Sequence, residues 1–420
     1  MSEELLYYVW KFGLFDTNLQ TDLNESLSVF TPGVQNISSG PDFTNSKIKV
    51  GNQTWFGNVE IHVKSSDWNK HGHKEDRAYD SIILHVVYEK DCEIDELVFR
   101  KIPTLELKNF INKQFVLKYN AFVNQNTWIP CQDSLGKIDS FIVDSWLDRL
   151  SIERIERKTQ QIEMLLNYFK GNWEKTFITW LSTCFGFKIN ALPFELLGKS
   201  IKVKHLINSN NVEALLLGIS GLIPENSNDY YVNEIQKVFD FEKLKWDIVP
   251  LNSTIWKKGG VRPYNQPELR IAQLAAVLSQ NKSGLLSHFL TIDTLDEVED
   301  FLTASPSNYW KNHFSFNSIS SKEHKTTIST ASKKLLIVNA VIPFLFFYGK
   351  TLNKEGVVRR ALKFMEEIPS EKNSIISKWK ELGIESRTVS RSQALLELYN
   401  QYCCVKKCLI CSIGNKVLMK

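Results

Sequence analysis

The chain has 420 residues, more than one hydrophobic core usually serves, and its 43% hydrophobic and 23% charged residues are ordinary globular composition. Two domains are therefore expected. The formal net charge of +4 permits a nucleic-acid partner without requiring one. The N-terminus lacks a signal-peptide pattern, and the longest apolar run, residues 335–348, is interrupted by Asn339 and Pro343 and is too short to span a bilayer. We expect a cytoplasmic protein.

The first 130 residues predict an α/β domain. Residues 3–12 carry apolar side chains at helical spacing, and Glu3 and Glu4 in the first turn favour the start of a helix. Further along, patterns typical of strands and of one more helix follow. The strands are predicted over residues 26–31, 47–50, 53–64, 81–88, 96–100 and 104–107, and the helix over residues 109–122.

The most informative strand covers residues 53–64. Its side chains alternate, so Trp55, Gly57, Val59, Ile61 and Val63 form an apolar face. The opposite face carries Asn58, Glu60, His62 and Lys64. A turn upstream presents Asp42, and a hairpin through Gly51 and Asn52 would bring Asp42 close to Glu60.

Three more histidines follow this strand within a short stretch. His71 and His73 lie in a polar loop that can lean over the polar face of the strand. His85 lies inside the apolar run 81–88, which is typical of a buried central strand. These histidines are candidates for binding a metal or a phosphate group, although an exposed His-x-His and a buried histidine also occur without any such role.

The sequence Pro41-Asp42, followed by Glu60-Ile61-His62, resembles the motif of the PD-(D/E)XK nuclease superfamily. The resemblance implies a nuclease-like mixed sheet with flanking helices, in which Asp42 and Glu60 hold Mg²⁺ or Mn²⁺. In that superfamily a helix before the first strand often adds a third acid. Histidine stands here in place of the superfamily's lysine, so His62 or Lys64 would position the attacking water.

These residues predict a metal-dependent nuclease acting on DNA or RNA. Two other functions remain open. The missing lysine favours a nucleic-acid-binding or scaffold protein on a nuclease fold without catalysis. The density of histidines favours a zinc-dependent hydrolase that uses His62, His71 and His73.

Residues 131–400 predict a mainly α-helical domain. Amphipathic runs cover residues 139–169, 173–185, 212–223, 229–246, 267–278, 331–348, 357–368 and 390–401. Between two of them, Lys257-Lys-Gly-Gly-Val-Arg262 precedes a helix that begins at Pro267, an arrangement typical of a phosphate-binding loop. Arg262, Asn265 and Arg270 are its candidate nucleic-acid ligands, and a purely structural turn is the alternative.

The last twenty residues, 401–420, predict a cysteine-rich clip. Cys403, Cys404, Cys408 and Cys411 crowd there, and Cys408-x2-Cys411 is a metal-binding spacing. Cys131 is a candidate fourth ligand from the domain junction. The outline is similar to one group of nucleases in which three late cysteines and one early cysteine hold an iron-sulfur cluster, so zinc and an iron-sulfur cluster are both candidate cofactors.

Most of the chain also resembles an uncharacterised bacterial protein family described only as a domain of unknown function, number 2851. The resemblance is carried by Gly40-Pro-Asp-Phe43, Gly57-Asn-Val-Glu-Ile-His62, Ser66-Asp-Trp68, His71-Gly-His73, Leu84-His-Val-Val87, Arg262-Pro-Tyr-Asn265 and the terminal cysteines. It implies no particular activity.

Overall fold

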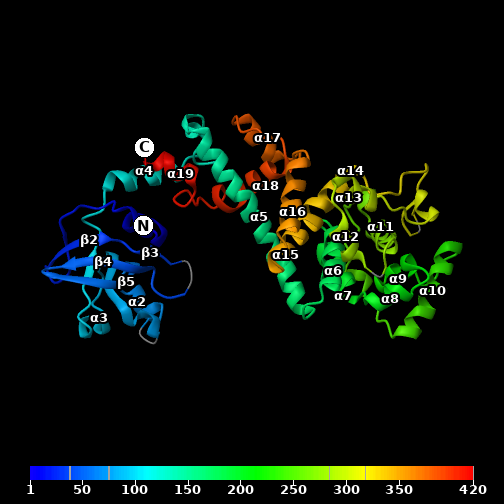
Figure 1. Ribbon diagram of the computed structural model, residues 1–420, viewed down its shortest axis with the longest axis horizontal. Coiled ribbons are helices and arrows are strands. Elements are labelled where there is room, and N and C mark those ends of the chain that lie inside the picture. Colours follow the sequence, from blue (N-terminus) through cyan, green and yellow to red (C-terminus); the bar gives the residue numbers. More distant parts are fainter. Residues whose placement is uncertain (37–38, 74–75, 283, 317, 420) are drawn as a thin grey trace. The chain divides into compact units, whose positions relative to one another are not determined.

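The computed structural model describes residues 1–36, 39–73, 76–282, 284–316 and 318–419 (Figure 1). The chain divides into two compact units. The first unit comprises Met1–Trp146 together with Tyr399–Lys420, and the second comprises Leu147–Leu398. The first unit thus extends beyond residue 130, where the sequence predicts the end of the α/β domain, and it includes the C-terminal segment.

The first unit is built on one mixed sheet of seven strands, ordered β1-β2-β4-β5-β6-β7, with β3 beside β4 (Figure 1). The neighbours from β1 to β5 pair antiparallel, whereas β5, β6 and β7 run parallel to one another. The strands are β1 (Leu19–Gln20), β2 (Ser26–Thr31), β3 (Val34–Gln35), β4 (Phe43–Val50), β5 (Gln53–Lys64), β6 (Ile82–Glu89) and β7 (Thr104–Glu106). The expected mixed sheet is therefore present.

Short helices flank this sheet. They are α1 (Glu3–Phe12), α2 (Asp67–Lys70), α3 (Asp95–Phe99), α4 (Lys113–Val123) and α19 (Ser412–Met419), with 3-10 turns at Arg77–Ser81 and Gln132–Lys137. The Ser2 hydroxyl caps α1 by accepting the Leu5 N–H, and Gly13 ends it in the left-handed conformation. The predicted bounds of α1, β2 and β5 are confirmed.

The strand predicted over residues 96–100 is wrong, because this segment forms α3. Asp95 and Glu96 favour the first turn of a helix, and Glu96 pairs with Arg100 one turn later at 3.0 Å. Glu96 also accepts a hydrogen bond from the Trp68 indole at 3.2 Å. Local helix signals and this tertiary contact outweigh a short apolar run that reads equally well as a strand.

The parallel strands β5 and β6 approach closely at Gly57, beside the start of β6. A Cβ atom on Gly57 would lie 2.4 Å from the Ile83 side chain and 2.6 Å from the Ser81 carbonyl oxygen. The parallel register then pairs Glu60 with His85. The glycine therefore helps to set the strand contact that places these two side chains side by side.

The second unit is helical, as expected. Its helices are α5 (Ser140–Tyr168, continuing from the first unit), α6 (Trp173–Phe185), α7 (Ala191–Ser200), α8 (Val203–Asn208), α9 (Val212–Ile219), α10 (Tyr230–Trp246), α11 (Pro267–Ser279), α12 (Leu285–Thr291), α13 (Leu295–Phe301), α14 (Thr330–Leu336), α15 (Ile342–Thr351), α16 (Glu355–Glu367), α17 (Ser374–Glu381) and α18 (Val389–Glu397). A small hairpin of β8 (His313–Ser315) and β9 (Ser318–Ile319) joins them. Its apolar core includes fully buried Phe177, whose ring contacts those of Phe289 and Phe344.

One helix in the described residues, Thr330–Thr351, has the length and apolar character of a membrane span. It runs through α14, a π-helical segment at Ile337–Val341, and α15. Of its most apolar window, 56% is buried inside the protein. Its side chains, such as Ile337 and Phe344, belong to the hydrophobic core of the second unit.

Candidate metal centre

Four histidines and a glutamate meet beside the centre of the sheet. Glu60 and His62 come from β5, His85 from β6, and His71 and His73 from the loop after α2. Glu60, His62, His73 and His85 are buried, whereas His71 is exposed. The strands hold Glu60, His62 and His85 in fixed positions. The loop covers these residues, and the cluster is exposed to solvent at His71.

The distances within the cluster fit a metal site. His62 Nε2 lies 3.2 Å from His71 Nδ1, 3.2 Å from His73 Nε2 and 3.7 Å from Glu60 Oε1, and His73 Nε2 lies 3.1 Å from Glu60 Oε1. Ligands at about 2.0–2.1 Å from a tetrahedral zinc ion are separated by about 3.4 Å. The spacing of the three histidine nitrogens fits one coordination sphere, and Glu60 Oε1 lies beside two of them, those of His62 and His73.

The protonation state of the histidines agrees with metal binding. Burial and the neighbouring histidines lower the pKa of His62 to about 2, and burial lowers the pKa of His85 to about 3. Both rings are therefore neutral near pH 7, which is the form that binds metals. His62 Nδ1 lies 3.0 Å from His85 Nε2. In the tautomer in which His62 Nδ1 carries the proton and donates it to His85 Nε2, the lone pair of His62 Nε2 faces His71 and His73.

Lone pairs that converge without a cation repel one another. His62 Nε2 has three heteroatoms within 3.7 Å, and neutral imidazoles offer few protons to place between them. In the described part of the chain, His62, His71 and His73 form a group whose ligand atoms all lie within 4.8 Å of one another. A divalent cation would satisfy this arrangement.

Asp42 and Glu60 converge, as the hairpin predicts. The Asp42 N–H donates to Glu60 Oε2 at 3.0 Å, and the Ile61 N–H donates to Asp42 Oδ2 at 2.9 Å. Burial raises the pKa of both carboxyls, and the Asp42 charge raises that of Glu60 further. This brace leaves Glu60 Oε1 directed at the histidines and fixes Asp42 beside them.

Helix α1 adds two residues, Glu3 and Tyr7, that occupy one helix face four positions apart. The Tyr7 hydroxyl donates to the Asp42 carboxylate, and Glu3 lies near both Asp42 and His71. Burial raises the pKa of the Glu3 carboxyl. Glu3 lies in the helix from which the nuclease resemblance implies a third acid. Tyr7 is not among the site residues predicted from the sequence, although its spacing from Glu3 places it on the same helix face.

The histidine loop is held by Asp91. Its carboxylate accepts hydrogen bonds from the Ser65 hydroxyl and the Ser66 N–H and hydroxyl, at 2.8–2.9 Å. Between the two loop histidines, Gly72 takes a φ of 72°. This left-handed turn, which favours glycine, aims both neighbouring rings at His62.

Aromatic rings wall the buried side of the cluster. Trp68 is fully buried, and its ring meets those of His73 and His85 edge-on with centroids 5.1 and 5.3 Å apart. Tyr79 packs on His73 with a centroid distance of 4.0 Å. These contacts exclude water from the inner side and fix the ring planes, so the site opens toward His71.

Lys64 differs from the other candidate residues of β5. It lies at the end of the strand and is exposed, and its backbone N–H donates to Asp67 Oδ2 at 3.1 Å. Its charge acts on Glu89, its partner in the β5–β6 register. The structure thus brings together Asp42, Glu60, His62, His71, His73 and His85, with Lys64 at the rim of the sheet.

The candidate phosphate-binding loop lies in the second unit. Arg262 is exposed, Asn265 is half-buried, and Arg270 is 4% exposed. The Arg270 guanidinium donates to Gln273 Oε1 at 2.9 Å, Asn265 Oδ1 at 2.6 Å and Ser332 Oγ at 3.1 Å, and it stacks over Phe187. These contacts give Arg270 a structural role, whereas Arg262 is exposed, as are Lys257 and Lys258 of the same loop.

Replacing Arg270 with Ala is expected to destabilise the protein by about 3 kcal/mol, because it leaves three buried or half-buried polar partners without their donor. Urea unfolding measures this loss. Arg262→Ala is the matched control and should stay within about 0.5 kcal/mol of the wild type. If the loop binds phosphates, Arg262→Ala alone should weaken nucleic-acid binding and lower its salt dependence. Equal stability of the two variants would refute the structural assignment of Arg270.

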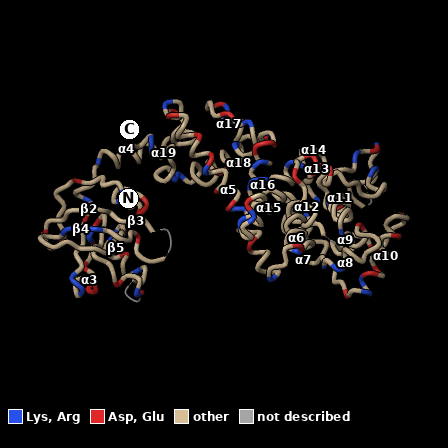
Figure 2. The backbone as a smooth tube through the Cα atoms, viewed as in Figure 1, with Lys and Arg blue, Asp and Glu red and all other residues tan. Residues whose placement is uncertain are grey.

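Charge is mixed in both units. Lys and Arg residues are interspersed with Asp and Glu along the backbone (Figure 2).

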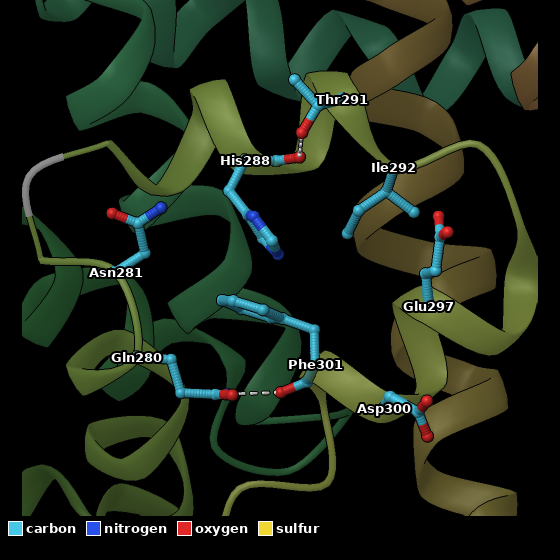
Figure 3. Close-up of a pocket in the computed structure, with 8 residues that line it drawn as sticks. All are labelled: Gln280, Asn281, His288, Thr291, Ile292, Glu297, Asp300 and Phe301. Carbon is cyan, nitrogen blue, oxygen red and sulfur yellow. Dashed lines mark hydrogen bonds between the residues drawn. The ribbon is translucent and has the colours of Figure 1, made fainter.

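The second unit also contains a pocket of about 570 Å³ at α12 and α13. Its His288 and Phe301 rings lie 4.7 Å apart (Figure 3). Its Glu297 accepts the N–H groups of Asp293 and Thr294 at 3.0 and 3.3 Å and closes the capping box of α13, so that carboxylate already has local partners.

The family profile described as a protein of unknown function (DUF2851) matches residues 3–374. The chain belongs to this family, which defines its class without defining an activity. The match includes the six converging residues of the candidate metal centre and ends before the cysteine-rich segment. No curated protein and no solved structure matches the chain.

Proposed function

We propose that this protein is a metal-dependent hydrolase of phosphodiesters in DNA or RNA, with its metal held by Glu60, His62, His71 and His73. The observation that carries the proposal is that one ring nitrogen from each of His62, His71 and His73 lies within 4.8 Å of the other two, with Glu60 Oε1 3.1 Å from His73 Nε2 and 3.7 Å from His62 Nε2. Such a set is directed at one cation and has no comparable use in packing.

The donor set favours a particular kind of ion. Imidazole nitrogen suits zinc and neighbouring transition metals, whereas Mg²⁺ and Mn²⁺ prefer carboxylate and water oxygens. The nuclease resemblance assigns Mg²⁺ or Mn²⁺ to Asp42 and Glu60. In the structure, however, Asp42 Oδ2 and Glu60 Oε2 each accept a hydrogen bond from a backbone N–H group. We therefore favour zinc, or another ion that accepts nitrogen ligands, over Mg²⁺.

The remaining residues have roles around that ion. A bound divalent metal would polarise a phosphoryl oxygen and lower the pKa of a water. Asp42 lies beside the metal ligands, held by Ile61 and Tyr7, and is positioned to accept a proton from the attacking water. His85 holds His62 in place through its 3.0 Å contact, which makes it a positioning residue.

Phosphodiesters are proposed as substrates for two reasons. Asp42 lies directly before β4 and Glu60 lies within the antiparallel neighbour β5, in the order of the nuclease motif, and α1 supplies Glu3 where the resemblance expects a third acid. The open side of the cluster, at His71, also gives a large polar substrate access. A nucleic acid fits these features better than a small apolar molecule does.

Metal analysis and a hydrolysis assay together test the proposal. Protein purified without chelators is expected to carry close to one zinc or similar ion at the histidines per chain, detected by nitrogen coordination in X-ray absorption. It should cleave single-stranded or duplex DNA or RNA, and dialysis against a strong chelator should stop cleavage until the metal is restored. Bound metal without cleavage of any nucleic acid would instead support a binding protein. Absence of metal at the histidines would refute the centre itself.

A further inference from the structure

Four cysteines that lie far apart in the sequence meet in the first unit. Cys131 precedes a 3-10 turn, and Cys403, Cys408 and Cys411 belong to the C-terminal segment. Cys131, Cys408 and Cys411 are 5–7% exposed, and each of the four sulfurs interacts electrostatically with the other three. Their convergence joins residues more than 270 positions apart.

Polar groups are directed at the Cys411 sulfur. It accepts hydrogen bonds from the backbone N–H groups of Ile413 and Gly414, which lie in the first turn of α19 (Ser412–Met419). Burial raises the pKa of the Cys411 thiol, and these two donors act in the opposite direction.

The turn between Cys408 and Cys411 is tightly wound. A Cβ atom on Gly414 would lie 2.6 Å from the Cys408 carbonyl oxygen and 3.0 Å from its Cα atom, so only glycine fits there. Lys406 takes a φ of 56° just before this turn, and the Cys408 N–H donates to its carbonyl at 2.8 Å. The backbone is thus packed closely around Cys408.

The cysteines are all free thiols, and Cys404 is the exposed one of the C-terminal group. A disulfide framework therefore does not account for the convergence. Packing alone does not account for it either, because donors directed at the Cys411 sulfur are polar groups that a buried apolar side chain would not need.

We propose that Cys131, Cys403, Cys408 and Cys411 bind a metal centre as four thiolates and so fasten the C-terminal segment to the N-terminal unit. The segment also buries Leu409, Ile413 and Leu418, and Lys118 Nζ donates to the Leu418 carbonyl at 2.8 Å. A metal centre would add folding free energy directly to these contacts.

The sulfur spacing bears on which centre forms. Four thiolates around one zinc ion would be separated by about 3.8 Å, given zinc–sulfur distances of about 2.3 Å. In the described part of the chain, the cysteine sulfurs do not form a group within the 4.8 Å that encloses the histidine ligand atoms. An iron-sulfur cluster holds its thiolates farther apart than a single ion does, so the spacing favours the cluster.

The test uses the full chain carrying His62→Ala, so that metal at the histidines does not interfere. Purified without oxygen, this protein is expected to contain one sulfur-bound centre per chain. Iron with acid-labile sulfide identifies a cluster, and zinc with four sulfur ligands in X-ray absorption identifies a single ion. Adding Cys408→Ser should remove the centre and raise the rate of proteolytic cleavage near the C-terminus at least tenfold.

Cys404→Ser is the matched control, because it changes the exposed neighbour of Cys403 and should retain both the metal and the protease resistance. If Cys408→Ser fails to fold, a mercurial reagent that releases thiolate-bound metal from the His62→Ala protein replaces it, with the same expected exposure of the terminus. Protein without sulfur-bound metal, or metal release that leaves the C-terminus equally resistant, would overturn the proposal.

Discussion

Replacing His62 with Ala is expected to lower the affinity of the histidine centre for its metal by well over 100-fold and to abolish hydrolysis. His62 is the hub of the cluster, since its Nε2 atom is the one within 3.7 Å of His71, His73 and Glu60 alike. Loss of an outer partner of a metal ligand already costs about 10–100-fold in affinity, so loss of a ligand should cost more. Competition with a chromophoric chelator measures the affinity.

Asp42→Asn separates metal binding from chemistry. The variant keeps the shape and one oxygen of Asp42 while removing its ability to take a proton. We expect the metal to stay bound and hydrolysis to fall by about 10²–10⁴-fold, the usual contribution of a general base. His324→Ala, which removes a histidine stacked on Phe314 in the second unit, is the control and should leave both properties unchanged. If His62→Ala kept full metal affinity, the ion would have to be bound elsewhere.

The strand that carries the centre could be predicted well, because its alternation is strict. β5 covers the predicted residues, and the hairpin brings Asp42 and Glu60 together as its turn residues indicate. The polarity of the two faces did not predict burial, since Glu60 and His62 are 4% and 1% exposed. Helix α1 and the histidine loop cover this polar face. The alternation of side chains along the strand does not reveal that other elements pack on it.

The histidine loop marks the limit of sequence reasoning. His71-Gly-His73 reads equally well as a solvated loop, and its approach to His62 depends on the Asp91 brace and on the backbone turn at Gly72. Asp91 lies after β6, so its contact with Ser65 and Ser66 follows from the parallel pairing of β5 with β6. Spacing along the chain does not encode that pairing.

More of the cysteine cluster than of the histidine loop could be predicted from the sequence. The spacing from Cys408 to Cys411 is local and visible in the sequence, and Cys131 was expected near the C-terminal segment, as the structure has it. The choice between Cys403 and Cys404 was not decidable from spacing. Burial and direction separate them, because Cys404 is exposed whereas Cys403 interacts with the other three sulfurs.

Glu397→Gln is expected to destabilise the second unit by about 3 kcal/mol. The Glu397 carboxylate is fully buried and pairs with Arg154 at 3.1 Å and with Arg157 at 2.6 Å. Gln preserves the shape but removes the charge, which leaves two guanidinium groups close together without their counterion. Breaking a buried ion pair from one side costs about 3–5 kcal/mol, and the half-exposure of Arg157 places the loss at the lower end.

The loss should depend on pH in a defined direction. Burial would raise the pKa of Glu397, but hydrogen bonds and charges from Arg157 and Arg154 outweigh it and lower that pKa below the ordinary value near 4.5. A carboxyl with a lowered folded-state pKa contributes its stability above its unfolded-state pKa and loses it as the pH falls through the folded-state pKa. Wild type and variant should therefore differ most at neutral pH and converge in acid.

Urea unfolding followed from pH 7 down into the acid range measures both effects. Glu156→Gln is the matched control, because Glu156 pairs with Lys350 at 2.7 Å on the surface, where both side chains are about half exposed. Exposed pairs contribute about 0–1 kcal/mol, so this variant should differ little from the wild type at any pH. A Glu397→Gln protein as stable as the control at pH 7 would mean that the two arginines reach solvent or another acceptor, and that this buried carboxylate does not hold α5 against α18.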